Sequence, residues 1–478
     1  MENKPLKSFL EIPYNELEEM NLHAKKRRKE KVDEKEIKEF YLNYLKKEKK
    51  LKAVTISFSN LEGRFHMIDY DKNYFLESYD NLTFDGSSIR GFSRQAESDL
   101  RLGIDWQAFW WLPCDVFGPG KVLLMGKIND QDEKPYQMDA RGILQRYLNV
   151  LYQKYQYTVY AANEVEGFLV KGVDAEQVFN EKTGFELVSM GGYYHSLPND
   201  VLRNFIDRVA EAQRAMGFEN EKDHPEVAPS QFELNYSYAD ALIAADQIQI
   251  YKLICRQVAR NMGMTATFLP KPVMGINGSG MHTNISIFKK DQNLFHDKEG
   301  RGKMSDLAWQ FIDKILSNAN DICLILNSSV NAYRRLDPHF EAPNEIKVSE
   351  IDRGAMIRIP LHNEKSARIE IRSVGTDANP YLLIYSLIKT GLEGEIGKVD
   401  KDKRHRARFL SGDINTAINY FRQSDLVKKI LGEEIKKKFI DLKQRTADRS
   451  PVELGTKVKN SEVIYHHEVH NQMLWNDF

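Results

Sequence analysis

Residues 268–288 read FLPKPVMGINGSGMHTNISIF. The centre of this stretch, Asn277-Gly-Ser-Gly-Met-His282, contains an amide, two glycines and an imidazole within six residues. Two glycines so close together predict an open loop. After His282 polar and apolar residues alternate, which predicts a strand with one polar face, carrying His282, Asn284 and Ser286. The stretch therefore predicts a glycine loop that leads directly into a polar-faced strand.

Three other predicted strands have the same polar bias. Side chains two residues apart on a strand point to the same side. The polar faces hold Glu164 and Glu166; Gln231, Glu233 and Asn235, with Glu226 just upstream; and Arg368, Glu370 and Arg372. One such strand is typical of a half-buried sheet with its polar side in water. Four strands with the same bias indicate a shared polar site.

A site built from these strands would hold five glutamates and one histidine. Two carboxylates about 4 Å apart repel each other by ~4 kcal/mol at an effective dielectric of ~20, so such a site needs cations. Oxygen ligands with one imidazole suit Mg²⁺ or Mn²⁺, whereas zinc sites use more thiolate and imidazole ligands. Two such ions beside arginines are typical of phosphoryl transfer. The arginines within forty residues of one another are Arg335, Arg353, Arg358, Arg368 and Arg372.

Composition and length indicate the class of protein. A chain of 478 residues predicts two or three domains. Its formal net charge of −1 gives no electrostatic reason to expect a nucleic-acid or membrane partner. Its longest apolar stretches are too short to span a membrane, and the N-terminus lacks the pattern of a signal peptide. Three widely separated cysteines fit a reducing compartment. We expect a cytoplasmic globular protein.

The sequence pattern divides the chain into three parts. Residues 1–50 form a charge-dense helical extension, and we interpret its basic run, residues 25–29, as a solvated helix face. Residues 51–120 form a small α+β domain that begins with a β-hairpin over residues 53–69. Residues 121–478 form a larger domain with a helical C-terminal part. In it we expect a strand at 157–170 and helices at 139–155, from 199 onward, and at 240–261, 305–326 and 380–392.

A series of motifs in one order resembles type I glutamine synthetase from about residue 51 to residue 395. The matching segments are Phe84-Asp-Gly-Ser-Ser-Ile89, Asn163-Glu-Val-Glu166, Gly191-Gly-Tyr193, Glu226-Val-Ala-Pro229 with Glu233, Lys271 to His282, Asn331 to Leu336, Phe340-Glu-Ala-Pro343, Arg368 to Arg372 and Asn379-Pro-Tyr-Leu382. The resemblance implies an α+β protein with a small N-terminal β-grasp domain and a large α/β catalytic domain that contains a curved antiparallel sheet. It also implies a homododecamer of two rings, with active sites between adjacent subunits.

The resemblance assigns a role to each polar position. Two Mg²⁺ or Mn²⁺ ions would bind, one to Glu166, Glu226 and Glu233 and the other to Glu164, His282 and Glu370. Glutamate would contact Asn277, Gly278, His282, Arg335 and Arg372. Arg353 would face the transferred phosphate, and ATP would contact Glu221, Tyr238, Ser286, Arg358, Lys365 and Arg368. The glycines would let the backbone approach the bound amino acid.

The implied reaction is the ATP-dependent ligation of ammonia to the γ-carboxylate of L-glutamate through γ-glutamyl phosphate. Ammonium would bind to Asp85, Ser88, Asp99, Tyr193 and Glu226, with Asp85 as the base. Glu341, on a closing flap, would take a proton from the tetrahedral adduct and help to exclude water.

Several positions depart from the family pattern. Pro225 stands where a second histidine follows His224, and His339 replaces a glycine of the flap. The segment that carries a regulatory tyrosine in some members is short here, over residues 397–407, and lacks tyrosine. Two alternatives therefore stay open: a γ-glutamyl-amine ligase that uses a small organic amine, and a non-catalytic scaffold.

Overall fold

The N-terminal sheet has five strands in the order β2-β1-β5-β4-β3. The computed structural model describes residues 8–30, 32–95, 98–179, 184–195, 200–336, 342–397 and 407–448. Strands β1 (Ala53–Ser59) and β2 (Phe65–Asp71) form the predicted antiparallel hairpin. Strands β3 (Thr83–Asp85) and β4 (Asp99–Trp111) complete the other edge. The flap with His339 and Glu341 and most of the segment 397–407 lie outside the described residues.

The boundary that we expected at residue 120 cuts through this first sheet. Strand β5 (Lys121–Asn129) lies between β1 and β4, parallel to β1 and antiparallel to β4. Its residues Val122, Leu123 and Leu124 are fully buried, so the sheet needs β5 to fill its centre. The proline and glycine residues before Lys121 mark a turn within the sheet and not its end.

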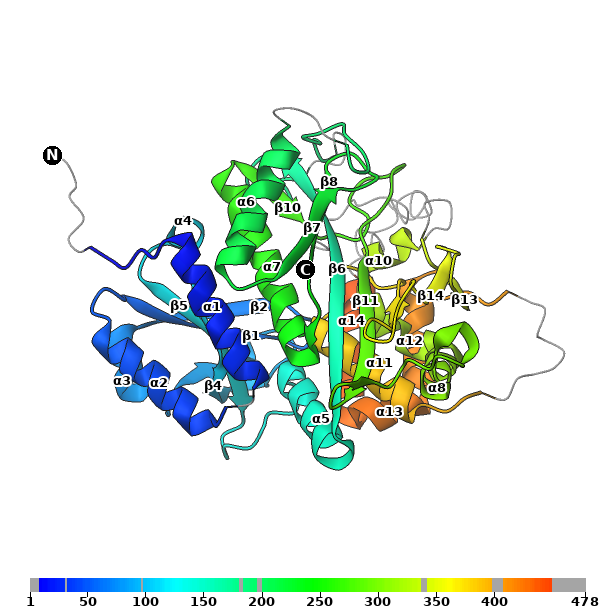
Figure 1. Ribbon diagram of the computed structural model, residues 1–478, viewed down its shortest axis with the longest axis horizontal. Helices are drawn as coiled ribbons and strands as arrows, with labels where there is room; N and C mark the ends of the chain where they lie inside the picture. The colour runs from blue at the N-terminus through cyan, green and yellow to red at the C-terminus, as the bar shows by residue number, and fades with distance from the viewer. Residues whose placement is uncertain are drawn as a thin grey trace.

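The N-terminal extension consists of helices α1 (Tyr14–Lys29) and α2 (Glu34–Lys47). Helix α1 packs against β4 and also against α6 (Val201–Ala215) of the larger part of the chain, as Figure 1 shows. The side-chain amide of Asn21 donates to the carbonyl oxygens of both Trp111 and Ala215. Helix α1 therefore joins the two parts of the molecule.

The basic run at residues 25–29 is only partly the solvated face that we expected. Arg28 forms a buried ion pair with Asp246, with 2.8 Å between Nη2 and Oδ2. Asp246 also accepts two hydrogen bonds from Arg141, and Arg141 forms an ion pair with Asp105 of β4. A buried chain of alternating charges thus links α1 and β4 with α5 (Ala140–Tyr155) and α7 (Ala241–Asn261).

The second sheet has ten strands. Its main path runs β13-β14-β15-β11-β6-β8-β7, and β9, β10 and β12 pair at its margins. The pairs on this path are antiparallel except β13 with β14. The strands are β6 (Tyr157–Lys171), β7 (Asn220–Pro225), β8 (Gln231–Tyr236), β9 (Ala239–Asp240), β10 (Met264–Thr267), β11 (Met281–Lys289), β12 (Gln292–Asn293), β13 (Glu345–Ser349), β14 (Ala355–Arg358) and β15 (Ile369–Ile371).

Most of the predicted helices are present. The side chain of Asp200 accepts a hydrogen bond from the first turn of α6, and that of Asn379 does the same for α11. Pro380 occupies the first position of α11, where no backbone N–H is needed. The helix expected at 305–326 is two helices, because the backbone leaves helical geometry at Asn318. The remaining helices are α3 (Lys72–Ser78), α4 (Cys114–Phe117), α5 (Ala140–Tyr155), α7 (Ala241–Asn261), α8 (Asp306–Ser317), α9 (Ala319–Leu326), α10 (Val330–Arg335), α11 (Pro380–Glu393), α12 (Ile414–Gln423), α13 (Asp425–Leu431) and α14 (Glu433–Asp448).

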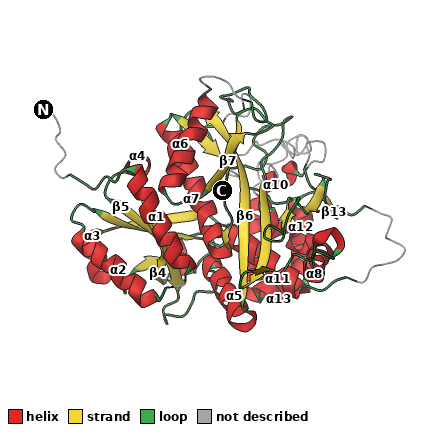
Figure 2. Ribbon diagram, in the orientation of Figure 1, coloured by secondary structure: helices red, strands yellow, loops and turns green. Residues whose placement is uncertain are grey.

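Helices and strands occur together in both parts of the molecule (Figure 2), which confirms the expected α+β class. Helices α7 and α11 are buried along most of their length, and their apolar residues belong to one core with those of both sheets. None of the described helices is both long and apolar enough to cross a membrane.

Candidate active site

Four adjacent strands of the large sheet bring the predicted polar residues together. In the order β15-β11-β6-β8, the register places His282 opposite Glu164, Glu370 opposite Asn284, and Glu166 opposite Glu233. Residues opposite each other in antiparallel strands have Cβ atoms about 5 Å apart, so their side chains meet. The antiparallel register therefore builds one continuous acidic surface from distant parts of the sequence.

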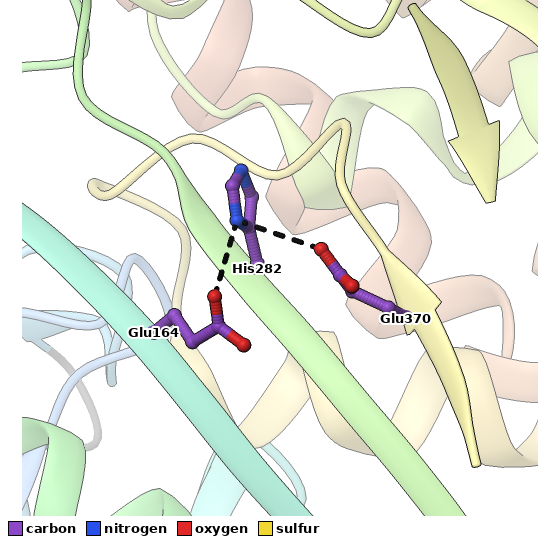
Figure 3. Close-up of side chains that lie close together, drawn as sticks. All are labelled: Glu164, His282 and Glu370. Carbon is purple, nitrogen blue, oxygen red and sulfur yellow. Dashed lines mark ion pairs between the residues drawn. The ribbon is translucent and has the colours of Figure 1, made fainter. Parts of the chain in front are cut away.

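Glu164, His282 and Glu370 form the first cluster (Figure 3). Nδ1 of His282 lies 3.6 Å from Oε2 of Glu164 and 3.7 Å from Oε1 of Glu370. Candidate ligand atoms of the three residues lie within 4.8 Å of one another. Asn284 donates to the other oxygen of Glu164 at 3.1 Å, which fixes the orientation of that carboxylate. These are the three residues assigned above to one ion.

The charge state of this cluster suits a cation. Burial alone would raise the pKa of Glu164, but hydrogen bonds from His282 and Asn284 outweigh it and lower the pKa to about 2. Burial and the charge of Arg372 lower the pKa of His282. At neutral pH the carboxylate is therefore ionised and the imidazole neutral, which are the forms that bind metals.

The second cluster contains His224, Glu226 and Glu233. Nδ1 of His224 lies 3.1 Å from the carbonyl oxygen of Pro225, which can only accept, so Nδ1 carries the proton. Nε2 is buried without a hydrogen-bond partner and lies 3.7 Å from Oε1 of Glu233. A buried imidazole nitrogen with a free lone pair beside two carboxylates is a donor set that a divalent cation completes.

Glu166 lies beside this cluster. Its Oε2 accepts hydrogen bonds from the backbone N–H of Gly280 at 2.7 Å and from the amide of Gln231 at 3.2 Å. Burial and the charge of Glu226 raise the pKa of Glu166 to about 8. Burial and neighbouring glutamates likewise raise the pKa of Glu226 to about 7 and that of Glu233 to about 8. These buried carboxylates repel one another, and two divalent cations in the site would neutralise their negative charge. The residues therefore fit the predicted metal ions.

A cavity of about 300 Å³ adjoins both clusters. The five residues predicted to bind glutamate, together with Arg353, all line it. Arg335 is buried and donates to the carbonyl oxygens of Val374 and Arg372, and burial lowers its pKa to about 10. Two backbone oxygens hold this guanidinium at the cavity, where its remaining N–H groups can bind a carboxylate.

The glycine loop forms one wall of this cavity. A Cβ atom on Gly280 would lie 2.2 Å from Nη2 of Arg335, and one on Gly278 would lie 2.4 Å from the carbonyl oxygen of Pro270. Gln231 also donates to the carbonyl oxygen of Gly278 at 3.0 Å. Both positions therefore require glycine, because the loop packs directly on the arginine and the backbone behind it.

A second cavity of about 460 Å³ lies along β6 and β11. Of the residues predicted to bind ATP, Glu221, Tyr238, Ser286, Lys365 and Arg368 line it. The rings of Tyr238 and Tyr160, which both line the cavity, pack edge to face with their centroids 5.4 Å apart. Arg358 lines the first cavity instead, where its Nε donates to Oε2 of Glu370 at 2.7 Å.

The residues predicted to bind ammonium fall into two groups. Tyr193 and Glu226 line the first cavity. Asp85, Ser88 and Asp99 lie together in the N-terminal sheet, exposed to solvent, and do not line that cavity. One described copy of the chain does not bring these two groups together.

With this geometry established, comparison with known proteins identifies the family. A model of the glutamine synthetase catalytic domain matches residues 137–456. The chain belongs to the glutamine synthetase family. It is 35% identical over 416 residues to the glutamine synthetase of Staphylococcus epidermidis, which covers 83% of the chain and 91% of the relative. It is 34% identical over 416 residues, with the same coverage, to the glutamine synthetase of Staphylococcus aureus.

Solved structures show the same fold. A complex of GmaS with ADP superposes with a TM-score of 0.75 at 24% identity and covers 88% of this chain and 99% of that one. A cryo-EM structure of Plasmodium falciparum glutamine synthetase superposes with a TM-score of 0.77 at 20% identity. The match covers 95% of this chain and 99% of that one. The glutamine synthetase fold is thereby confirmed, and the family makes this chain an ATP-dependent ligase.

Sequence reasoning missed the position of His224 in this glutamine synthetase site. We treated His224 only as a departure from the paired histidines of the family. The register of β7 and β8 places it opposite Glu233. An alternating pattern in residues 220–226, with Lys222, His224 and Glu226 two apart, could have placed His224 on the same face as Glu226, although not opposite Glu233.

Proposed function

We propose that the chain joins ammonia to the γ-carboxylate of L-glutamate, using ATP, and releases glutamine, ADP and phosphate. The observation that carries the proposal is the pair of adjoining cavities. One contains every residue predicted to bind glutamate, and the other contains most of those predicted to bind ATP. Glu164 of the first metal cluster lines both cavities. Glutamate, which accepts the phosphoryl group, and ATP, which donates it, would therefore meet at that cluster.

In the first step an oxygen of the γ-carboxylate attacks the γ-phosphorus of ATP. The bond from that phosphorus to the β–γ bridging oxygen breaks, and ADP leaves. Arg335 and Arg372 hold the amino acid, and Arg353, on the same cavity wall, faces the transferred group. Two Mg²⁺ or Mn²⁺ ions, held at the six positions assigned above, would neutralise phosphate charge and polarise the transferred group.

In the second step ammonia attacks the acyl phosphate and phosphate leaves. Ammonium must first lose a proton, and Asp85 is the proposed base. Hydrogen bonds from Ser87 and Ser88 hold the carboxylate of Asp85 and lower its pKa. It is therefore ionised at neutral pH, the form that attracts the ammonium cation. Glu341, outside the described residues, keeps its predicted role as acceptor of the second proton.

We propose further that the protein is a type I enzyme in which two copies build each site. The exposed group Asp85, Ser88 and Asp99 of one copy would complete the cavity containing Tyr193 and Glu226 of the next. Contacts that join different surfaces of identical subunits form a ring when the rotation between neighbours closes. A double-ringed homododecamer satisfies this requirement.

The test is ADP release by purified protein with glutamate, Mg²⁺ and ATP, to which ammonium or one of several small amines is added. We expect turnover with ammonium that is lost in Asp85→Ala. Turnover only with an organic amine would assign the protein to the γ-glutamyl-amine ligases. Absence of turnover with every amine, in folded and metal-loaded protein, would support the scaffold alternative.

Mixing two inactive variants tests the shared site. Asp85→Ala and Glu166→Gln are each expected to be inactive alone. In mixed oligomers about one quarter of the sites would combine an intact Asp85 from one copy with an intact Glu166 from the next, and activity would return in proportion. Mixed oligomers without activity would refute sites built from two copies.

A further inference from the structure

Lys222 has no role in the assignments above, yet it stands at the junction of the two cavities. Among the residues that line them, Glu164 and Lys222 are the two that both cavities share. Glu164 belongs to the first metal cluster. The two cavities therefore adjoin beside a carboxylate and an ammonium group.

The backbone of β7 directs Lys222 toward the site. Lys222 pairs with Asn235 of β8, and His224 pairs with Glu233. Because the two β7 residues are two apart, their side chains leave the strand on the same face. The pairing of β7 with β8 is irregular between Asn220 and Lys222, and such irregularities often redirect a side chain beside a site.

Lys222 is also an uncommitted cation. Its side chain makes no hydrogen bond and no ion pair with any residue of the described ranges. The arginines of the first cavity differ, because Arg358 and Arg372 bind Glu370 and Arg335 binds backbone oxygens. The charge of Lys222 nevertheless acts on the site, since it lowers the pKa values of Glu164, Glu226 and Glu233 against the opposing effect of their burial.

We propose that Lys222 binds the terminal phosphates of the nucleotide and positions the γ-phosphoryl group at the boundary between the two cavities. The inference rests on the proposed function, and it names a positioning residue for that reaction. A lysine ammonium is a point charge with three donors on a flexible stem, which suits a polyphosphate whose oxygens move during transfer. Unlike Arg335 and Arg372, which line only the glutamate cavity, Lys222 also lines the cavity proposed for the nucleotide, which favours a phosphate over the α-carboxylate as its partner.

Calorimetric titration with ADP and with AMP, in the presence of excess Mg²⁺, tests this proposal without relying on turnover. In Lys222→Met we expect the dissociation constant for ADP to rise about tenfold, since one charge-assisted hydrogen bond is lost. The dissociation constant for AMP should stay within twofold. Lys222→Arg should retain most of the affinity for ADP. Lys298→Met is the matched control, because Lys298 is exposed, outside both cavities, and carries the same charge.

Two results would overturn the proposal. One is an unchanged affinity for ADP in Lys222→Met while the wild-type protein binds ADP. The other is an unchanged ratio of ADP to AMP affinity together with tighter binding of Mn²⁺ to the nucleotide-free variant, which would show that Lys222 only neutralises the carboxylates. A wild-type protein that binds no ADP would instead refute the proposed function itself, and with it this inference.

Discussion

Replacing Gly278 by alanine should disable the enzyme without unfolding it. A Cβ atom at this position would lie 2.4 Å from the carbonyl oxygen of Pro270 and 3.0 Å from Cγ of Arg335. Ordinary contacts begin at about 3.4 Å, so the loop would have to move by about 1 Å. The Pro270 oxygen cannot give way easily, because it accepts a 2.7 Å hydrogen bond from the N–H of Ser279.

A displacement of about 1 Å at a binding loop costs on the order of 10²-fold in rate, or ~2.7 kcal/mol of transition-state stabilisation. We therefore expect kcat/KM for glutamate to fall by about two orders of magnitude in Gly278→Ala. The loss should include a higher KM, because Arg335 and the backbone of Gly278 both face the substrate cavity.

The assay is steady-state ADP release with glutamate varied at saturating ammonium and ATP. Gly412→Ala is the matched control, because a Cβ atom on Gly412 meets nothing within 4 Å. Circular dichroism and the elution volume of the oligomer would confirm that both variants are folded and assembled. A Gly278→Ala enzyme whose kcat/KM stays within threefold of wild type would show that this loop does not position glutamate.

Three further predictions concern stability, pH and metal binding. Arg28→Met should lower the free energy of unfolding by about 2 kcal/mol, a loss that stays limited because the buried Asp246 keeps its other partners. The control Lys26→Met, on the exposed side of the same helix, should lower it by less than ~0.5 kcal/mol. Equal losses in the two variants would contradict the argument. Burial lowers the pKa of Lys252 from 10.5 to about 7, so the unfolded chain binds more protons across that interval and stability should rise with pH from 7 to 10.5. Denaturant midpoints at pH 7 and 9 should show this rise in the wild type and its absence in Lys252→Met. Glu370→Gln should reduce the number of Mn²⁺ ions bound per chain from two to one in calorimetric titrations, and two ions with unchanged affinities would remove this residue from the metal site.

The sequence was most informative where the alternation of residues along a strand determines the face on which each side chain lies. Alternation in Asn163 to Glu166 and in Arg368 to Arg372 predicted which carboxylates share a face of each strand, and the antiparallel register brings Glu164 and Glu370 together at His282. A register between distant strands is not contained in the periodicity of either strand, so the pairing of His224 with Glu233 could not be derived.

Boundaries and surfaces were harder to predict for the same reason. The turn before Lys121 resembles the end of a domain, but the parallel pairing of β5 with β1 depends on a partner more than sixty residues away. The basic run 25–29 has the composition of a solvated surface, and a partner far along the chain buries Arg28. Local pattern identifies an element, and long-range contact decides what the element touches.

The position of α1 has a consequence for synthesis of the chain. Arg28 and Asp246 are 218 residues apart, and Asn21 and Ala215 are 194 apart. At ~5–20 residues per second, the ribosome needs roughly 10–40 s to produce the partners of α1 after the helix itself has emerged. During this interval Leu17 and Ala24, which are buried in the finished protein, have no catalytic part to pack against. Helix α1 can pack on β4 early, but the part of its surface that contacts α6 and α7 stays uncovered until those helices have been made.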